Sequence, residues 1–418
     1  MSLRAPFVHA ASFNLLNATQ FLTVFNDNVF KQTVVLIAIG AQGSRGNGHA
    51  LAQFLFSVPF LLFALYAGDL ADRFSKRDLV VVTKAAEVLV MLLGAVALAA
   101  GSLAGGLIVL FLMAAQSAFL GPAKYGSIPE YAGSAGLARA NGWFQGMMMG
   151  GIVLGTGAAG LLVGGGAMPI WGVPLLLAAI AAVGTALAWP MRRLPAAEPG
   201  RRARFAPVQR LARGVRDAAA RPGMLAVQLG HALFWFASSL AYVGWNELIA
   251  TRPDGTQLVA ADQVLWSLGL AAMGAAMGAG AIICGFAAQH VPLARLAAVG
   301  GCTLGGGLTL AGLVRPEPGF ILACGVTASF GSGFLVIPLR TLIQRLAPPE
   351  RLGAVLGTSQ TLDFTGIALG AVARVALRPF GADARDALVF TGAVLLVGLL
   401  LLARGISAAE SAAARSTG

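Results

Sequence analysis

The chain has 418 residues, of which 57% are hydrophobic and only 11% are charged. Soluble proteins average about 25% charged residues, and the mean hydropathy here is +0.78. Long apolar runs recur along the whole chain, which predicts an all-α membrane protein and excludes a barrel of short alternating strands. The net charge of +12 does not predict a nucleic-acid partner, because most Lys and Arg residues fall in short connections between apolar runs.

The N-terminal half contains six apolar segments, each close to the length of about 20 residues that crosses a bilayer. The first is too long for the core of a cleavable signal peptide and carries polar residues at its centre, so we interpret it as a membrane span. Charged or polar connections occupy residues 69–78 and 122–138. The predicted spans are 13–39, 49–68, 79–100, 106–121, 140–163 and 169–190.

An arginine-rich stretch at 191–221 follows, and six further apolar segments come after it. They are 224–250, 263–288, 293–314, 319–346, 353–377 and 387–403. We therefore predict a six-helix bundle at 1–190, a basic linker at 191–221 and a second six-helix bundle at 222–418. Cys284, Cys302 and Cys324 lie inside apolar segments without metal-ligand spacing, so we expect them to be small buried residues, and neither a metal nor a cofactor is expected.

The distribution of basic residues predicts the orientation in the membrane. Connections with even numbers carry most of the Lys and Arg residues, so these connections and both termini are expected in the cytoplasm. We interpret the arginine run as a topology signal, and contact with anionic headgroups is the alternative.

The two halves resemble each other. Gly68 corresponds to Gly285, segment 121–124 to 337–340, and segment 141–145 to 356–360, all at an offset of about 216 residues. Parallel six-helix repeats of this kind are the plan of major facilitator transporters.

The connection after the second span reads Gly68-Asp69-Leu70-Ala71-Asp72-Arg73-Phe74-Ser75-Lys76-Arg77. It resembles the signature loop of the major facilitator superfamily, with a serine at the second glycine position. The resemblance implies a conformational latch in which Asp72 caps the start of segment 353–377, as suits an anion at a helix N-terminus. The latch residues would be Gly68, Asp69, Asp72, Arg73, Lys76 and Arg77. An ordinary charged turn is the alternative.

Asp27 lies between two asparagines in the middle of the first span. A carboxylate at the centre of a membrane helix costs about 2.5–3.5 kcal/mol, so we interpret Asp27 as a functional residue that faces a polar interior. The alternative is a residue near the helix end that pairs with Lys31, four positions later. Lys84 and Glu87 in the third span have the spacing of a pair that neutralises itself.

Five segments together resemble the lysophospholipid transporter (LplT) family of the major facilitator superfamily. They are 25–31, 68–78, 84–88, 116–126 and 140–145, whereas the C-terminal half carries the resemblance more thinly, mainly at 334–344. The family includes transporters fused to acyltransferase and acyl-carrier-protein synthetase domains. The resemblance implies that the chain moves lysophosphatidylethanolamine and lysophosphatidylglycerol from the outer to the inner leaflet of the bacterial inner membrane. A separate acyltransferase or acyl-carrier-protein synthetase is expected as a partner, because no such domain is appended here.

The resemblance also implies a substrate site. Asp27 would meet the headgroup ammonium, and its neighbouring amides would suit glycerol hydroxyls. Family members used for comparison carry an arginine in the seventh span, but residues 224–250 contain none, so Lys31 or Arg340 is expected to meet the phosphate. The expected substrate-binding residues are Asp27, Asn28, Lys31, Lys124, Tyr125 and Arg340.

The alternative function is a proton-coupled exporter of drugs or hydrophobic metabolites on the same fold. Its candidate proton carriers are Asp27, Glu247 and Asp363, whereas His231 is expected at the membrane interface. An enzyme is not expected, because the sequence contains neither a Gly-x4-Gly-Lys-Ser/Thr loop nor a His-x4-Asp motif. No catalytic residues are therefore assigned.

Overall fold

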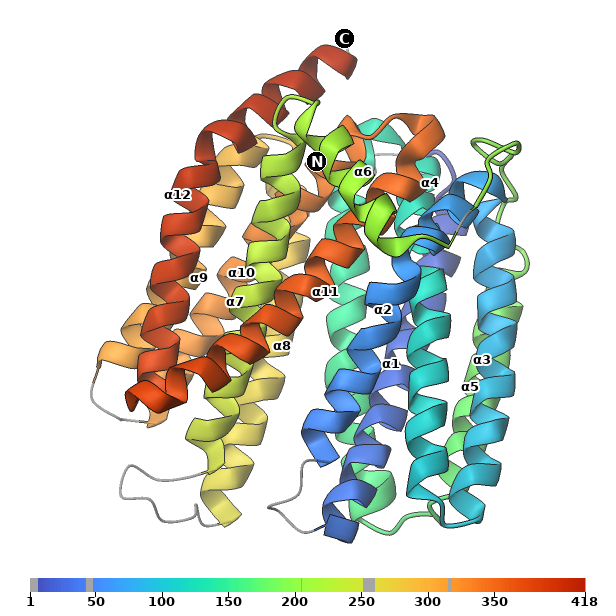
Figure 1. Cartoon of the computed structure of the whole chain (residues 1–418), viewed down its shortest axis with the longest axis vertical. Helices are drawn as coiled ribbons and strands as arrows, with labels where there is room; N and C mark the ends of the chain where they lie inside the picture. The colour runs from blue at the N-terminus through green and yellow to red at the C-terminus, as the bar shows by residue number, and fades with distance from the viewer. Residues whose placement is uncertain (1–6, 43–47, 204, 251–259, 315–317, 418) are drawn as a thin grey trace. The chain divides into compact units, whose positions relative to one another are not determined.

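A computed structural model describes residues 7–42, 48–203, 205–250, 260–314 and 318–417 of the chain, and the described elements are all helical (Figure 1). Short π-helical and 3-10 turns follow α4 at Gly160–Gly164 and flank α11 at Pro349–Arg351 and Arg378–Phe380. The all-α prediction is confirmed. The helices are α1 Ala10–Gln42, α2 Gly48–Arg73, α3 Lys76–Ala99, α4 Leu103–Ala159, α5 Gly172–Ala188, α6 Pro207–Ala219, α7 Met224–Ala250, α8 Ala260–Ala287, α9 Leu293–Leu313, α10 Pro318–Leu346, α11 Leu352–Leu377 and α12 Ala384–Thr417.

Helix α4 contains two of the predicted spans in one run of 57 residues. The polar segment 122–138 was expected to be a connection, but it is helical except at Gly133, where φ is 72° and ψ is 169°. This positive φ is open to glycine at little cost, so Gly133 provides the bend that separates the two spans. With α4 counted twice and the linker helix α6 set aside, the described helices match the twelve predicted spans.

Eight helices in the described part of the chain are long and apolar enough to cross a membrane: α2, α3, α4, α7, α8, α9, α10 and α12. Helix α5 is apolar but has only 17 residues. Helices α1 and α11 are long enough yet fall outside this set, and both contain ionisable residues, including Asp27 in α1 and Asp363 in α11.

The helices form two compact units. Unit 1 comprises Met1–Gly136, Gly150–Gly214 and Ala347–Thr361, and unit 2 comprises Leu137–Met149, Val215–Leu346 and Leu362–Gly418. Each unit thus contains most of one half of the chain and a short helical piece that belongs by sequence to the other half. The predicted division at the linker 191–221 stays a prediction.

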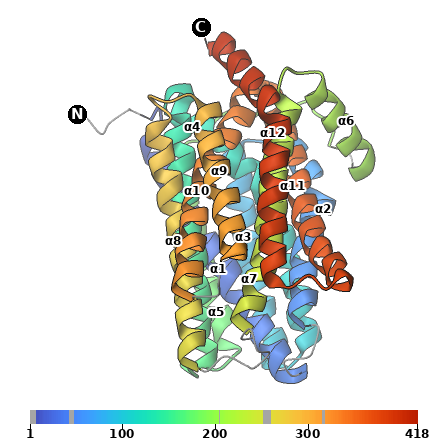
Figure 2. The same cartoon turned by 90° about the vertical axis from the view of Figure 1, so that its left-hand side faces the viewer.

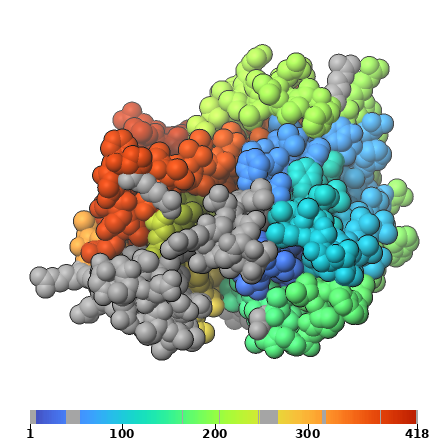
Figure 3. All heavy atoms as spheres, turned by 60° about the horizontal axis from the view of Figure 1, so that its bottom comes forward, coloured from blue at the N-terminus to red at the C-terminus, as the bar shows by residue number. Residues whose placement is uncertain are grey.

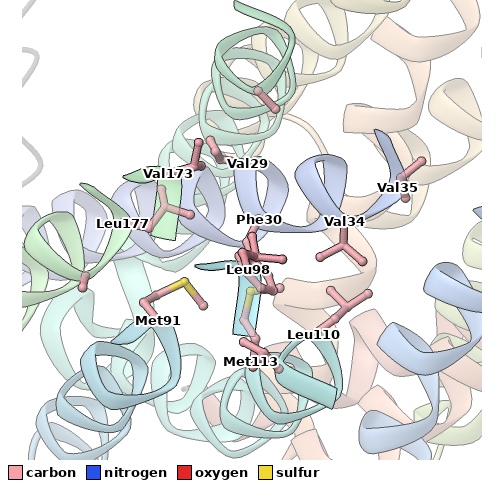
Figure 4. Packing of buried hydrophobic residues seen from close by; sticks show 13 residues of the cluster. Val29, Phe30, Val34, Val35, Met91, Leu98, Leu110, Met113, Val173 and Leu177 are labelled. Carbon is pink, nitrogen blue, oxygen red and sulfur yellow. The ribbon is translucent and has the colours of Figure 1, made fainter. Parts of the chain in front are cut away.

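In unit 1, α1 and α3 both pack against α5. Buried apolar side chains from α1, α3, α4 and α5 converge there, among them Val29, Phe30, Met91, Leu110 and Leu177 (Figure 4). Close packing of this kind associates helices in lipid, where no hydrophobic force acts between them. The cluster holds α1 in place on either side of its polar residues.

In unit 2, α10 packs against both α8 and α9, and α12 packs against α7 and α9 (Figure 2). Cys284, Leu296 and Ile337 belong to a buried cluster between α8, α9 and α10. The expectation that the cysteines are small buried residues holds for Cys284 and Cys324, whereas Cys302 is exposed.

Candidate functional site

Asp27 lies within unit 1, and its side chain is buried. One carboxylate oxygen, Oδ2, accepts a hydrogen bond of 2.8 Å from the Ser117 hydroxyl on α4. The other, Oδ1, is buried and accepts no hydrogen bond from any residue that the structure describes. Lys31, Lys84 and Lys124 are close enough to interact with this carboxylate electrostatically. Asp27 is therefore a buried carboxyl group with a neutral direct partner, and its second oxygen has no hydrogen-bond donor among the described residues.

Lys84 and Glu87 on α3 form a fully buried ion pair with 2.6 Å between Nζ and Oε2. The predicted mutual neutralisation of these two side chains is confirmed. The Asn26 amide donates to Glu87 Oε1 at 2.9 Å and to the Leu177 carbonyl, also at 2.9 Å. Asn26 therefore ties the ion pair to α1 and α5, and it fixes the helical turn that presents Asp27.

The remaining polar residues of this turn lie nearby. The Asn28 amide donates to the Val24 carbonyl of its own helix, so that amide is already engaged. The Lys31 ammonium lies 5.1 Å from the centre of the Phe56 ring, and Lys124 lies 5.6 Å from the centre of the Tyr125 ring. The structure thus brings Asp27, Lys31 and Lys124 into one polar region of unit 1.

Unit 2 contains a second buried carboxylate, Asp363. Its Oδ1 lies 2.7 Å from Nδ1 of His231, and its Oδ2 lies 3.5 Å from a guanidinium nitrogen of Arg340. The His231 side chain is fully buried, and its expected place at the membrane interface stays a prediction. An ionisable residue inside a span is by default a functional candidate, and that rule identifies His231 where its position near the helix start does not.

Glu247 pairs with Arg374, and 2.5 Å separate the carboxylate from the guanidinium. Arg374 also donates to the Ala382 carbonyl at 3.2 Å, so the pair fastens the end of α11 to α7. This geometry supports a structural role, and the role of Glu247 as a proton carrier stays a prediction.

The predicted latch lies in unit 1 at the junction of α2, α3 and α11. Asp72 accepts hydrogen bonds from the backbone N–H groups of Gly353 at 2.6 Å and Ala354 at 2.9 Å, as an anion at a helix N-terminus should. Gly68 lies so close to the same helix that a Cβ would come within 2.5 Å of the Gly353 carbonyl oxygen. The contact expected from the loop motif is present, and its role as a conformational latch stays a prediction.

The other latch residues have separate partners. Lys76 pairs with Glu130 at 2.6 Å. Arg77 lies over the Trp189 ring at 5.0 Å, and Arg73 is exposed. Asp69 is fully buried and forms ion pairs with two arginines of the linker, Arg201 at 2.9 Å and Arg210.

Sequence reasoning missed Ser117 and the linker arginines, and it did not anticipate that the Asn26 amide donates to Glu87 and Leu177. Asn26 and Ser117 are polar residues inside apolar runs, and interior-facing polar residues are the signal that could have drawn attention to them. The linker arginines were interpreted from their charge alone, as a topology signal. Nothing in their spacing indicates that Asp69, about 130 residues earlier in the chain, is their partner. Among the described residues, no group of three or more His, Cys, Asp or Glu side chains could hold a metal ion.

Comparison with known proteins agrees with this arrangement. Residues 16–371 match the family model of the Major Facilitator Superfamily. The chain is similar to the lysophospholipid transporter LplT of Klebsiella pneumoniae subsp. pneumoniae, with 28% identity over 353 residues and 81% of each chain covered. It is 27% identical to the LplT protein of Escherichia coli strain SE11 over 335 residues, which cover 78% of each chain. The resemblance to LplT proteins noted in the sequence is thereby confirmed.

Solved structures show the same fold. The human organic anion transporter MFSD10 matches with a TM-score of 0.71 at 14% identity, covering 94% of this chain and 99% of its own. The Escherichia coli fucose:proton symporter matches with a TM-score of 0.72, also at 14% identity, covering 93% of this chain and 98% of its own. The chain therefore belongs to the major facilitator superfamily and is a multi-pass membrane transporter rather than an enzyme.

Proposed function

We propose that this protein moves lysophospholipids, chiefly those with ethanolamine and glycerol headgroups, from the outer to the inner leaflet of the bacterial inner membrane. The relatives named lysophospholipid transporter, which match about four fifths of the chain, support this substrate class. Transport would proceed by rocking of two six-helix bundles around a central site, as in other transporters with parallel repeats. Both termini would lie in the cytoplasm.

The observation that carries the proposal is the unsatisfied oxygen of Asp27. Buried polar atoms almost always have hydrogen-bond partners, and an exception needs an explanation. Oδ1 of Asp27 lacks a donor within the described residues, while Oδ2 is held by Ser117. An ethanolamine ammonium or a glycerol hydroxyl would supply the missing donor, and the ammonium would also neutralise the charge.

The phosphate of the same headgroup needs a cation. Lys31 and Lys124 both interact electrostatically with Asp27, so a phosphate that follows the ammonium along the headgroup would find a lysine within reach. Tyr125 stands beside Lys124 and adds a hydroxyl. Arg340 of unit 2 is the alternative phosphate partner, and binding there would compete with its ion pair to Asp363.

The remaining parts of the proposal concern the cycle and its partners. The bonds from Gly353 and Ala354 to Asp72 would hold one conformation until they break. A separate acyltransferase or acyl-carrier-protein synthetase would consume the lysophospholipid that arrives in the inner leaflet.

The test is uptake of labelled lysophosphatidylethanolamine by proteoliposomes that contain the purified protein. Asp27→Asn keeps the size of the side chain but removes its charge. We expect it to lower uptake by a factor of about ten or more, which corresponds to a loss of roughly 1.4 kcal/mol of binding free energy. Asp217→Asn, which changes an exposed carboxylate of α6, is the matched control. Unchanged uptake by Asp27→Asn would contradict the assignment of Asp27.

Headgroup preference gives a second measurement with the same vesicles. A choline headgroup has no N–H or O–H donor for Asp27, so lysophosphatidylcholine should be taken up more slowly than the ethanolamine lipid. This difference should shrink in Asp27→Asn. Equal uptake of the two lipids by the parent protein would contradict a hydrogen bond from headgroup to carboxylate.

The buried pair of His231 and Asp363 favours one alternative, a proton-coupled exporter of drugs or hydrophobic metabolites. Histidine changes charge near neutral pH and is a common proton carrier. Proton movement that depends on added drug, measured with a pH-sensitive dye inside the vesicles, would support the exporter. Lysophospholipid uptake that is unaffected by collapse of the pH gradient would support the primary proposal.

A further inference from the structure

The linker between the two halves docks onto the latch through charged side chains. Arg201 donates to Asp69 Oδ1 at 2.9 Å, and its guanidinium also lies 3.6 Å from Asp72 Oδ2. Arg210, one helical turn into α6, forms an ion pair with the second oxygen of Asp69. Asp69 is fully buried, so these two arginines neutralise a charge that would otherwise be costly at this position.

Backbone and apolar contacts extend the same docking. The Glu198 N–H donates to the Asp72 carbonyl at 2.8 Å, and the Glu198 carboxylate orients Arg201 from 2.7 Å. The Phe205 ring lies against Phe63 and Tyr66 of α2, at centroid distances of 6.0 and 6.4 Å. The yellow-green linker lies along blue α2 in both Figure 1 and Figure 3.

The end of the docked segment reaches α11. A Cβ on Gly214 would come within 2.3 Å of the Thr358 hydroxyl oxygen, so α6 lies in close contact with the Thr358 side chain of α11 at this point. The described residues 198–203 and 205–214, which we call the strap, therefore contact both partners of the latch. They meet α2 at Asp69 and Asp72, and the first turns of α11 at Thr358.

We propose that the strap is a conformational clamp that holds the junction of α2 and α11 closed, and that it must leave Asp69 before the latch can open. This proposal rests on the proposed function insofar as it assigns the latch to a transport cycle. The docking itself is independent of the substrate. Arg201 and Arg210 act as positioning residues, because neither needs to touch the transported molecule.

The test is a disulfide between the strap and α11. A Cβ on Gly214 would lie 3.1 Å from Cβ of Thr358, a few tenths of an ångström from the usual range of about 3.5–4.5 Å in disulfides. We expect Gly214→Cys/Thr358→Cys, with the three native cysteines replaced by alanine, to cross-link rapidly in membranes under mild oxidant. Cross-linked and open protein are separated after proteolysis on non-reducing gels.

Arg201→Gln and Arg210→Gln, each added to the cysteine pair, should slow cross-linking about tenfold, the effect of losing one charge-assisted contact. Arg201→Lys keeps the charge and should restore part of the rate. Arg216→Gln changes an exposed arginine of the same helix and should leave the rate unchanged. If both glutamine variants are monodisperse and cross-link at the parental rate, the clamp is refuted.

Transport by the cross-linked protein separates this proposal from the substrate assignment. Oxidation should abolish lysophosphatidylethanolamine uptake, and dithiothreitol should restore it, whereas oxidation of the cysteine-free parent should have no effect. Uptake at the parental rate by the cross-linked protein would refute the requirement for strap release. If the cysteine-free parent takes up no lysophospholipid while the arginine variants still slow cross-linking, the proposed substrate fails and the docking of the strap stands.

Discussion

Asp27 in unit 1 and Asp363 in unit 2 are both carboxylates buried inside long helices, but their surroundings differ. Asp363 is compensated on both oxygens, by His231 at 2.7 Å and by Arg340 at 3.5 Å. Asp27 has a hydroxyl partner on one oxygen and none among the described residues on the other. Burial alone therefore does not identify a binding residue. A buried carboxylate oxygen without a hydrogen-bond or ionic partner, by contrast, gives a reason to expect a ligand.

The same contrast appears in the buried ion pairs of the two units. Lys84 and Glu87 are both fully buried, whereas Glu247, the partner of Arg374, has a side chain that is 26% exposed. Glu87 is therefore enclosed by protein, whereas Glu247 is partly exposed. Four sets of variants test these differences between the two units.

Lys84→Met should destabilise the protein by about 3–5 kcal/mol, because it leaves Glu87 as an unpaired buried charge. Arg374→Met should cost less, since Glu247 is partly exposed. The measurement is the apparent melting temperature of the detergent-solubilised protein. Lys84→Met/Glu87→Gln removes both charges and should recover much of the loss; a double variant as unstable as the single one would show that packing around Lys84 matters more than its charge.

Asp363→Asn should lower stability by about 3 kcal/mol, because His231 and Arg340 would both lose the carboxylate that they share. Asp27→Asn should leave the melting temperature unchanged or raise it, since it removes a buried charge that lacks a direct ionic partner. Melting curves of the two variants, recorded side by side, test this directly. A larger loss for Asp27→Asn than for Asp363→Asn would reverse our interpretation of the two carboxylates.

Gly68→Ala should destabilise unit 1 by about 1–3 kcal/mol, because its Cβ would meet the Gly353 carbonyl oxygen at 2.5 Å. Gly285→Ala in unit 2 should cost less, because the nearest atom there, the Ala138 carbonyl oxygen, is 2.9 Å away. Gly157→Ala is the control, since no atom lies within 4 Å of the added Cβ. Equal melting temperatures for the first two variants would mean that the helices move apart to accommodate the methyl group.

Asp72→Asn should cost about 1 kcal/mol through the loss of an anion at the start of α11. Glu410 has the same relation to the start of α9, where it accepts from the backbone N–H groups of Leu293 at 2.5 Å and Ala294 at 3.2 Å. Each carboxylate also has an arginine nearby, Arg201 for Asp72 and Arg345 for Glu410, so Glu410→Gln should cost about as much as Asp72→Asn. Chemical denaturation in detergent measures both, and a much larger cost for one variant would contradict the same capping role for the two carboxylates.

The spans and the internal repeat were predictable from the sequence for simple reasons. A run of about twenty apolar residues identifies a membrane span without any knowledge of its tertiary contacts. The two halves can be aligned because matching segments keep the same separation along the chain, even where individual residues differ. The structure shows that equivalent residues of the two halves make equivalent helix contacts. Gly357 lies against Ala64 and Gly68 in unit 1, and Gly142 lies against Ala281 and Gly285 in unit 2.

The parts that the sequence did not predict depend on contacts between distant residues. Ser117 meets Asp27 only because α4 crosses α1 at that depth, and no periodicity encodes the crossing. The arginines of the strap carry the same charge as any topology signal, so their docking on Asp69 could not be distinguished from solvation. The contact of His231 with Asp363 joins residues 132 positions apart, so it could not be inferred from the position of His231 along its helix.

The bend at Gly133 has a mechanical consequence. A flexible connection between two membrane spans would absorb the tilting of either one, but α4 is helical on both sides of a single glycine. Rotation of one helical part of α4 relative to the other must therefore pass through one pair of backbone torsions, those of Gly133. A single methyl group at this position would make the hinge stiffer.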